Sequence, residues 1–158
     1  MIRAAVQVEP IDIVAELVSI ESDGAGAVAT FTGLVRADLH DDGSVGLLEL
    51  EHYPGMTERT LLTLCEEATA RWSLLGATVV HRVGPMHPGE RIVFVAAAAP
   101  HRTAALAACG FLIDRLKTDA PFWKRETRGG EARWIEARAS DDAAAARWSE
   151  NPLHAAKD

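Results

Sequence analysis

The sequence predicts an α+β protein with a mixed or mainly antiparallel sheet. Two long segments repeat apolar residues at helical spacing, and short runs rich in β-branched residues alternate with them. Several neighbouring runs are joined by connections too short for a parallel crossover, which favours antiparallel pairing. We expect residues 1–148 to form one domain and residues 149–158 a flexible tail.

The N-terminal third is predicted to contain three strands and one short helix. Residues 2–8 and 27–35 are apolar runs with the β-branched and aromatic residues typical of strands. Apolar residues repeat at helical spacing across 11–18. Residues 45–53 alternate between apolar and polar in their second half, which indicates a half-buried strand after a polar loop at 38–44.

The middle third begins with a turn at Pro54 and the clearest helical pattern of the chain. This helix is expected over 57–72, with Thr57 as its N-cap. Residues 78–83 and 91–98 are then expected to be neighbouring strands joined by a tight connection that contains glycine and proline. The second of these strands is almost entirely apolar, which predicts a central, buried position.

The last third is predicted to hold a second long helix, a hairpin and a short helix. The long helix covers 100–116, and Pro121 prevents its continuation. Residues 122–127 and 132–137 are predicted strands joined by a turn with two consecutive glycines, the signal of a hairpin. The final helix is delimited by a cap at Ser140 and Asp141 and an end near Trp148.

Composition argues against several classes of protein. The net charge of −7 argues against binding to nucleic acid or to an anionic membrane surface, because both need a basic face. No apolar run reaches membrane-spanning length and the N-terminus lacks the layout of a signal peptide, so we expect a cytoplasmic protein. Cys65 and Cys109 are isolated among apolar neighbours and are predicted to be buried core thiols.

Lysine is rare in this chain and is clustered. Of sixteen basic residues only Lys117, Lys124 and Lys157 are lysines, and the first two lie close together. Burial or a neighbouring cation such as Arg125 shifts an amine toward its nucleophilic form, and the two aromatic residues before Lys124 would exclude water. The pair is a candidate reaction centre. On composition alone, chance clustering explains the pattern equally well. Contact of Lys117 with the negative end of its own helix would explain that lysine but not Lys124.

A second candidate site lies at the start of the second long helix. His101 and Arg102 flank backbone N–H groups that favour an anion, so we predict a phosphate site with Arg36 as a further guanidinium. The alternative is a solvated first turn. His81 and His87 have no carboxylate or cysteine at ligand spacing, so no metal site is predicted, and no nucleotide-binding or hydrolase motif occurs.

Five blocks of sequence carry a family resemblance. They are FTGLVR at 31–36, LEHYPGM at 50–56, HRVG at 81–84, PHR at 100–102 and LKTDAPFWKRE at 116–126. In this order and spacing, across residues 24–148, they resemble the large, catalytic subunit of molybdopterin synthase. Several blocks in register are far more specific than any single motif.

The resemblance implies an α/β-hammerhead with a small additional β subdomain. It also implies a homodimer of large subunits that binds a small ubiquitin-like sulfur-carrier subunit at each end, giving a heterotetramer. The thiocarboxylate at the carrier's C-terminus would transfer sulfur, twice, to cyclic pyranopterin monophosphate and so form the dithiolene of molybdopterin. The resemblance implies no metal and no organic cofactor for this step.

The resemblance also assigns residues. Lys117 and Lys124 match the essential lysines of the family. Residues that match the lining of the anionic substrate pocket are Phe31, Arg36, His101, Arg102, Arg125 and Glu126. Arg138 is expected to reach the phosphate pocket of the partner subunit, or else to be a solvated strand-end residue. Leu34 departs from the pattern, because many members have a basic residue there, and the polar loop after Arg36 is short.

Two other functions compete with this interpretation. One is a non-catalytic partner protein that binds a phosphorylated ligand or a carrier tail. The other is a lyase that forms a Schiff base on Lys117 or Lys124. Retention of both lysines speaks against the first, and the sequence supplies no carbonyl-recognising site for the second.

Overall fold

The first of two sheets forms the centre of the protein. The computed structural model describes residues 1–37, 39–40, 43–135 and 139–149. In the first sheet β1 and β5 are parallel and the other neighbours are antiparallel, so the sheet is mixed, as predicted. Its strands run in the order β1 (Ile2–Gln7), β5 (Gly76–Arg82), β7 (Arg91–Ala99) and β2 (Ala27–Leu34).

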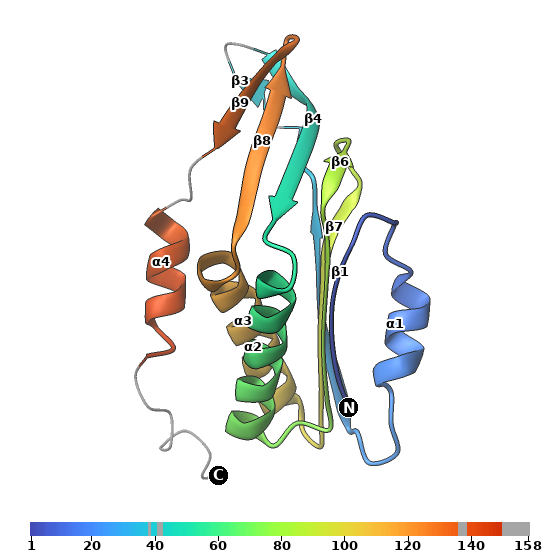
Figure 1. Cartoon of the computed structure of the whole chain (residues 1–158). Helices are drawn as coiled ribbons and strands as arrows, with labels where there is room; N and C mark the ends of the chain where they lie inside the picture. The colour runs from blue at the N-terminus through green and yellow to red at the C-terminus, as the bar shows by residue number, and fades with distance from the viewer. Residues whose placement is uncertain (38, 41–42, 136–138, 150–158) are drawn as a thin grey trace.

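Helices cover both faces of this sheet (Figure 1). α1 (Ile13–Ile20) lies on one face, and α2 (Met56–Trp72) and α3 (Arg102–Asp119) lie on the other. In β7 the alternation of side chains places Val95 under α2 and α3 and Phe94 under α1, both at most 1% exposed. Because each face has a helical cover, β7 is apolar along nearly its whole length rather than at every second residue.

The second sheet extends beyond the ends of α2 and α3 (Figure 1). All its pairings are antiparallel, and β6 connects it to the first sheet by following β5 directly. Gly129 and Gly130 both have positive φ, as a two-residue hairpin turn between β8 and β9 requires. The elements of this region are β3 (Leu39–His40), β4 (Gly43–His52), β6 (Gly84–Met86), β8 (Phe122–Arg128), β9 (Glu131–Ile135) and, after the sheet, α4 (Ala139–Ala146).

The predicted class and most elements are confirmed, but the predicted N-cap of α2 was wrong. The N-cap is Gly55, at φ 82°, and its N–H donates to the side chain of Glu58. Thr57 lies inside the first turn and is fully buried. Its hydroxyl accepts a hydrogen bond from the N–H of Tyr53 and donates one to the carbonyl of Pro121, so it ties the start of α2 to the start of β8.

Three smaller differences concern short elements. β6 lies within the connection predicted between two strands, and β3 lies within the predicted loop. α4 begins at Ala139, so Ser140 and Asp141 fall in its first turn rather than at its cap. Most of the predicted tail, residues 150–158, lies outside the described residues. None of the helices in the described ranges is long and apolar enough to cross a membrane.

The two cysteines behave as predicted. Cys65 and Cys109 are buried and free. Burial raises the pKa of the Cys65 thiol to about 12 and that of Cys109 to about 11. Both are therefore neutral thiols that pack as small apolar groups in the core between the first sheet and α2 and α3.

Candidate functional site

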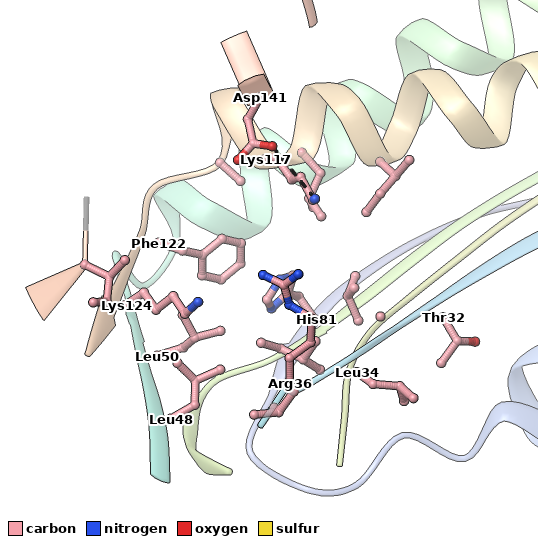
Figure 2. Close-up of a pocket in the computed structure, with 18 of the residues that line it drawn as sticks. Thr32, Leu34, Arg36, Leu48, Leu50, His81, Lys117, Phe122, Lys124 and Asp141 are labelled. Atoms are coloured by element: carbon pink, nitrogen blue, oxygen red, sulfur yellow. Dashed lines mark ion pairs between the residues drawn. The ribbon is translucent and has the colours of Figure 1, made fainter. Parts of the chain in front are cut away.

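A pocket of about 720 Å³ lies where the two sheets and the end of α3 meet (Figure 2). The end of β2 forms one wall, β4 and β8 another, and the last turns of α3 a third. Its charged lining consists of three cations and two carboxylates, so the pocket is locally positive in a chain of negative net charge. These residues are Arg36, Lys117, Lys124, Glu126 and Asp141.

Lys117 enters the pocket from the last turns of α3. The helix ends because Ala120 is extended and Pro121 follows it. The Nζ atom of Lys117 lies 3.9 Å from an oxygen of Asp141, and its side chain is about half exposed. The amine is therefore accessible from the pocket, with a carboxylate from α4 beside it (Figure 2).

Lys124 enters from β8 and is held by a buried carboxylate. Its Nζ lies 2.8 Å from Glu126 Oε1, and Glu126 Oε2 accepts a hydrogen bond from Arg128 at 2.8 Å. Burial raises the pKa of Glu126, but the hydrogen bonds from Lys124 and Arg128 outweigh it and hold that pKa below its usual value. Glu126 is thus an anion that orients the amine of Lys124 toward the pocket.

The end of β2 supplies the third cation and the Phe-Thr-Gly block of the sequence. Phe31, Leu34 and Arg36 all line the pocket. A Cβ atom on Gly33 would come within 2.6 Å of the Val93 side chain, so this position requires glycine for close strand approach. Leu34 is half exposed and follows a shift in register, and it presents an apolar side chain to the pocket where the resemblance led us to expect a basic one.

The sequence predicted that Arg125 would lie beside the two lysines, and the structure places it elsewhere. Side chains alternate along β8, so Arg125 lies on the face opposite Lys124. Its guanidinium donates to Glu49 at 2.6 Å and lies 5.5 Å from the ring of Trp134. Arg125 does not line the pocket. Of the two aromatic residues before Lys124, Phe122 lines the pocket and the other, Trp123, is exposed.

His101 and Arg102 lie at the other end of α3 from Lys117 (Figure 1). At 1.5 Å per residue, the helix separates His101 from Lys117 by about 24 Å. Both residues are exposed, and neither lines the pocket of the same chain. Arg138 lies outside the described residues. The sequence hypothesis of one site that unites these residues with the lysines is thus not met within a single chain.

Two residues that line the pocket were missed as site candidates. His81 was considered as a metal ligand and as part of a family block but not as a site residue, although a histidine inside a fully buried strand is itself a signal. Asp141 was considered only as a helix cap. Within the described residues, no group of three or more His, Cys, Asp or Glu side chains is arranged to hold a metal ion.

The fold and the pocket define a class of protein. The pocket is large enough for a ring-sized ligand, has apolar side chains among its lining, and presents two amines and a guanidinium. This combination suits an enzyme or binding protein for an anionic small molecule with an apolar part.

Comparison with known proteins identifies the family. The family model described as MoaE protein matches residues 6–119. A molybdopterin synthase catalytic subunit from Cereibacter sphaeroides is 50% identical over 148 residues, which is 92% of this chain and 99% of that protein. The chain belongs to the MoaE family.

Solved structures agree with this assignment. A molybdopterin biosynthesis MoaE protein from Burkholderia ambifaria is 44% identical, with a TM-score of 0.81 over 95% of this chain and 99% of that chain. A molybdopterin synthase structure from Staphylococcus aureus is 30% identical, with a TM-score of 0.80 over 84% of this chain and 96% of that chain.

Proposed function

We propose that this protein is the catalytic subunit of molybdopterin synthase and acts as a sulfurtransferase. The observation that carries the proposal is the approach of Lys117 and Lys124 to one pocket from two different elements, with Arg36 on the third side. Family membership supports it, because relatives at about half identity are named as such catalytic subunits. A cytoplasmic location remains a prediction.

The proposed reaction joins a carrier to a pterin. A thiocarboxylate at the C-terminus of a small ubiquitin-like carrier enters the pocket, and its sulfur forms a carbon–sulfur bond with the side chain of cyclic pyranopterin monophosphate in place of a carbon–oxygen bond. Water then hydrolyses the carrier's acyl–sulfur bond, so the carrier leaves as a carboxylate and the sulfur stays on the pterin. Two such transfers form the dithiolene. The amines of Lys117 and Lys124 move protons and stabilise the oxyanion that develops on the carrier's carbonyl. Arg36 pairs with the substrate's phosphate.

A carboxylate lies beside each lysine, at hydrogen-bond distance from Lys124 and farther from Lys117. Glu126 is a hydrogen-bonded anion 2.8 Å from Lys124, and Asp141 lies 3.9 Å from Lys117. Both lysine side chains are partly exposed, so the Nζ of Lys124 is oriented but accessible to a ligand, and the Nζ of Lys117 is accessible beside a negative charge.

His101 and Arg102 fit the proposal only through a second copy of the chain. Because α3 separates them from Lys117 by about 24 Å, they serve a phosphate in this kind of pocket only if the partner brings them to it. We therefore propose a homodimer with shared sites, to which Arg138 also contributes. Mixing Arg102→Ala with Lys117→Ala subunits should restore activity above either parent, and no recovery after subunit exchange would contradict the shared site.

Reconstitution tests the function itself. The purified protein, the thiocarboxylated carrier and cyclic pyranopterin monophosphate are incubated together, and molybdopterin is detected after oxidation to a fluorescent pterin. Formation that depends on all three components is expected. Binding of both ligands without product would instead support the non-catalytic alternative, and trapping of a substrate by borohydride on a lysine would support the Schiff-base alternative.

A further inference from the structure

His81 contributes a polar group to the wall of the pocket from a strand that is otherwise buried and largely apolar. Every residue of β5 is buried, and His81 is 7% exposed. Its side chain lines the same pocket as Lys117, Lys124 and Arg36. In Figure 2 His81 lies among these residues, and the nitrogen atoms of both lysines point toward the space around it.

Hydrogen bonding determines which ring nitrogen of His81 carries a proton. Its Nδ1 atom lies 2.8 Å from the backbone carbonyl oxygen of Arg82. A carbonyl oxygen only accepts, so Nδ1 must donate. Burial lowers the pKa of His81 to about 4, so the ring is neutral near pH 7 and its Nε2 atom keeps an acceptor lone pair. No side chain or backbone group within the described ranges donates a hydrogen bond to Nε2.

The ring of His81 is also fixed in orientation. It stacks on Phe122, with ring centroids 4.0 Å apart and an angle of 25° between the planes. Phe122 is the first residue of β8, two positions before Lys124. The same strand therefore positions the Lys124 amine and supplies the ring on which His81 stacks. Stacking and the hydrogen bond to Arg82 leave the ring little freedom, which is the property required of a recognition group.

The other polar side chains of the pocket do not duplicate this acceptor. Arg36, Lys117 and Lys124 only donate. The two carboxylates, Glu126 and Asp141, each lie beside a lysine. Thr32 lines a separate part of the pocket in Figure 2 and carries a hydroxyl that both donates and accepts. A neutral, oriented acceptor beside donors for an anion suits a ligand that has an anionic end and a heterocycle with N–H groups.

We infer that His81 is a specificity-determining residue whose Nε2 accepts a hydrogen bond from an N–H group of the substrate's heterocycle, while Arg36 engages its phosphate. This inference rests on the proposed function. A histidine that only packs on Phe122 would affect folding stability, whereas an acceptor for the substrate affects the binding of the pterin.

Kinetics of two substitutions test the inference. His81→Phe keeps an aromatic ring for stacking and removes the acceptor, and His81→Gln keeps a neutral acceptor. Loss of a partner for a buried donor should raise KM for the pterin about tenfold in His81→Phe, with KM for the carrier unchanged. His81→Gln should stay closer to the wild type. The control is His87→Gln, at an exposed histidine that does not line the pocket.

Nuclear magnetic resonance of the wild type gives a readout that does not require a variant to fold. With ¹⁵N-labelled histidine, Nε2 of His81 should appear unprotonated in the free protein at pH 7 and should shift when cyclic pyranopterin monophosphate is added, but not with the carrier alone. A protonated Nε2 in the free protein, or no shift at saturating pterin, would overturn the inference. So would a His81→Phe protein with wild-type KM for the pterin.

Different results would contradict the role of His81 and the proposed function. If the wild type converts the pterin and His81→Phe does so with unchanged constants, only the role of His81 is wrong. If the wild type forms no molybdopterin from carrier and pterin, the proposed function is wrong and the inference about His81 falls with it.

Discussion

The first sheet with its helices and the second sheet differ in what their side chains do. β5 is buried throughout and β7 is buried from Val93 onward, and the four alanines that end β7, 96–99, have 0% exposure. By contrast, every residue of β9 is exposed, and β8 begins with two aromatic residues and continues with the ion-paired side chains of Lys124, Arg125 and Glu126. The first region supplies most of the buried apolar area, and the pocket lies where the two regions meet: Lys117, Arg36 and His81 come from the first region, and Lys124 and Glu126 come from the second. Stability therefore depends mainly on the first region, whereas the chemistry depends on both.

The largest effect is expected at Lys124, where a change should abolish activity without unfolding the protein. Lys124→Ala should lower the rate of molybdopterin formation by about 10³-fold, within the range for removing a proton-transfer group. Its free energy of unfolding should change by less than about 1 kcal/mol, because Glu126 keeps its bond to Arg128. Lys124→Arg should also fail, since a guanidinium keeps the charge but does not release its proton.

The Lys124 prediction is checked by single-turnover assays and urea unfolding of the same preparations. Lys157→Ala, at the chain's third lysine, is the control. A Lys124→Arg protein with near-normal turnover would show that charge alone is sufficient and that amine chemistry is not required.

Truncation of core and hairpin aromatic residues should separate the two regions by stability. Phe94 is 1% exposed beneath α1, and Phe94→Ala should cost about 3–5 kcal/mol through lost burial and a cavity. Trp134 on β9 is 56% exposed, and Trp134→Ala should cost less than about 1 kcal/mol. Urea denaturation measures both. Equal losses would mean that the face of β9 is covered in solution, as by a second copy of the chain.

His81 lies where the two regions meet, and it should make stability depend on pH. Its pKa is about 4 in the folded protein and near 6.5 when unfolded. Between these values the unfolded chain binds a proton that the folded protein does not, so stability is fully present above pH 6.5 and falls as the pH is lowered toward 4. The loss from this one group should be on the order of 3 kcal/mol.

Comparison of wild type with His81→Phe isolates the contribution of His81. The carboxylates titrate in both proteins, so their effect on stability cancels in the difference. The difference in free energy of unfolding between the two should shift in favour of the variant as the pH falls from about 7 to about 4. Parallel pH profiles would show that His81 is not held neutral by burial.

The smallest effect is expected at Arg125, on the outer face of β8. Its ion pair with Glu49 is partly exposed, so Arg125→Ala should change the free energy of unfolding by less than about 1 kcal/mol. Since Arg125 points away from the pocket, Kd for the pterin should change less than in an Arg36→Ala protein. Calorimetric titration with the pterin measures this, and an equal loss in both variants would restore Arg125 to the substrate site.

The sequence was sufficient for the elements whose signal is local. Apolar periodicity placed α2, α3 and β7 within a few residues of their observed bounds, and Gly129 and Gly130 marked the hairpin correctly. The same kind of local rule separates Arg125 from Lys124, because adjacent residues of a strand point to opposite faces of the sheet. Local rules failed at Thr57, because a hydrogen bond to the carbonyl of Pro121, just before β8, decided its role.

Only the tertiary structure decided which residues share a site. Lys117 and Lys124 meet because Pro121 ends α3 and β8 returns beside the same pocket, a local event that the sequence records. His81 and Asp141 join them from β5 and α4, and His101 is carried away by the length of α3. Spacing along the chain does not report such distances, because they depend on how the sheets and helices pack against one another. The sequence by itself therefore determined the residues and the family, and the packing determined the pocket.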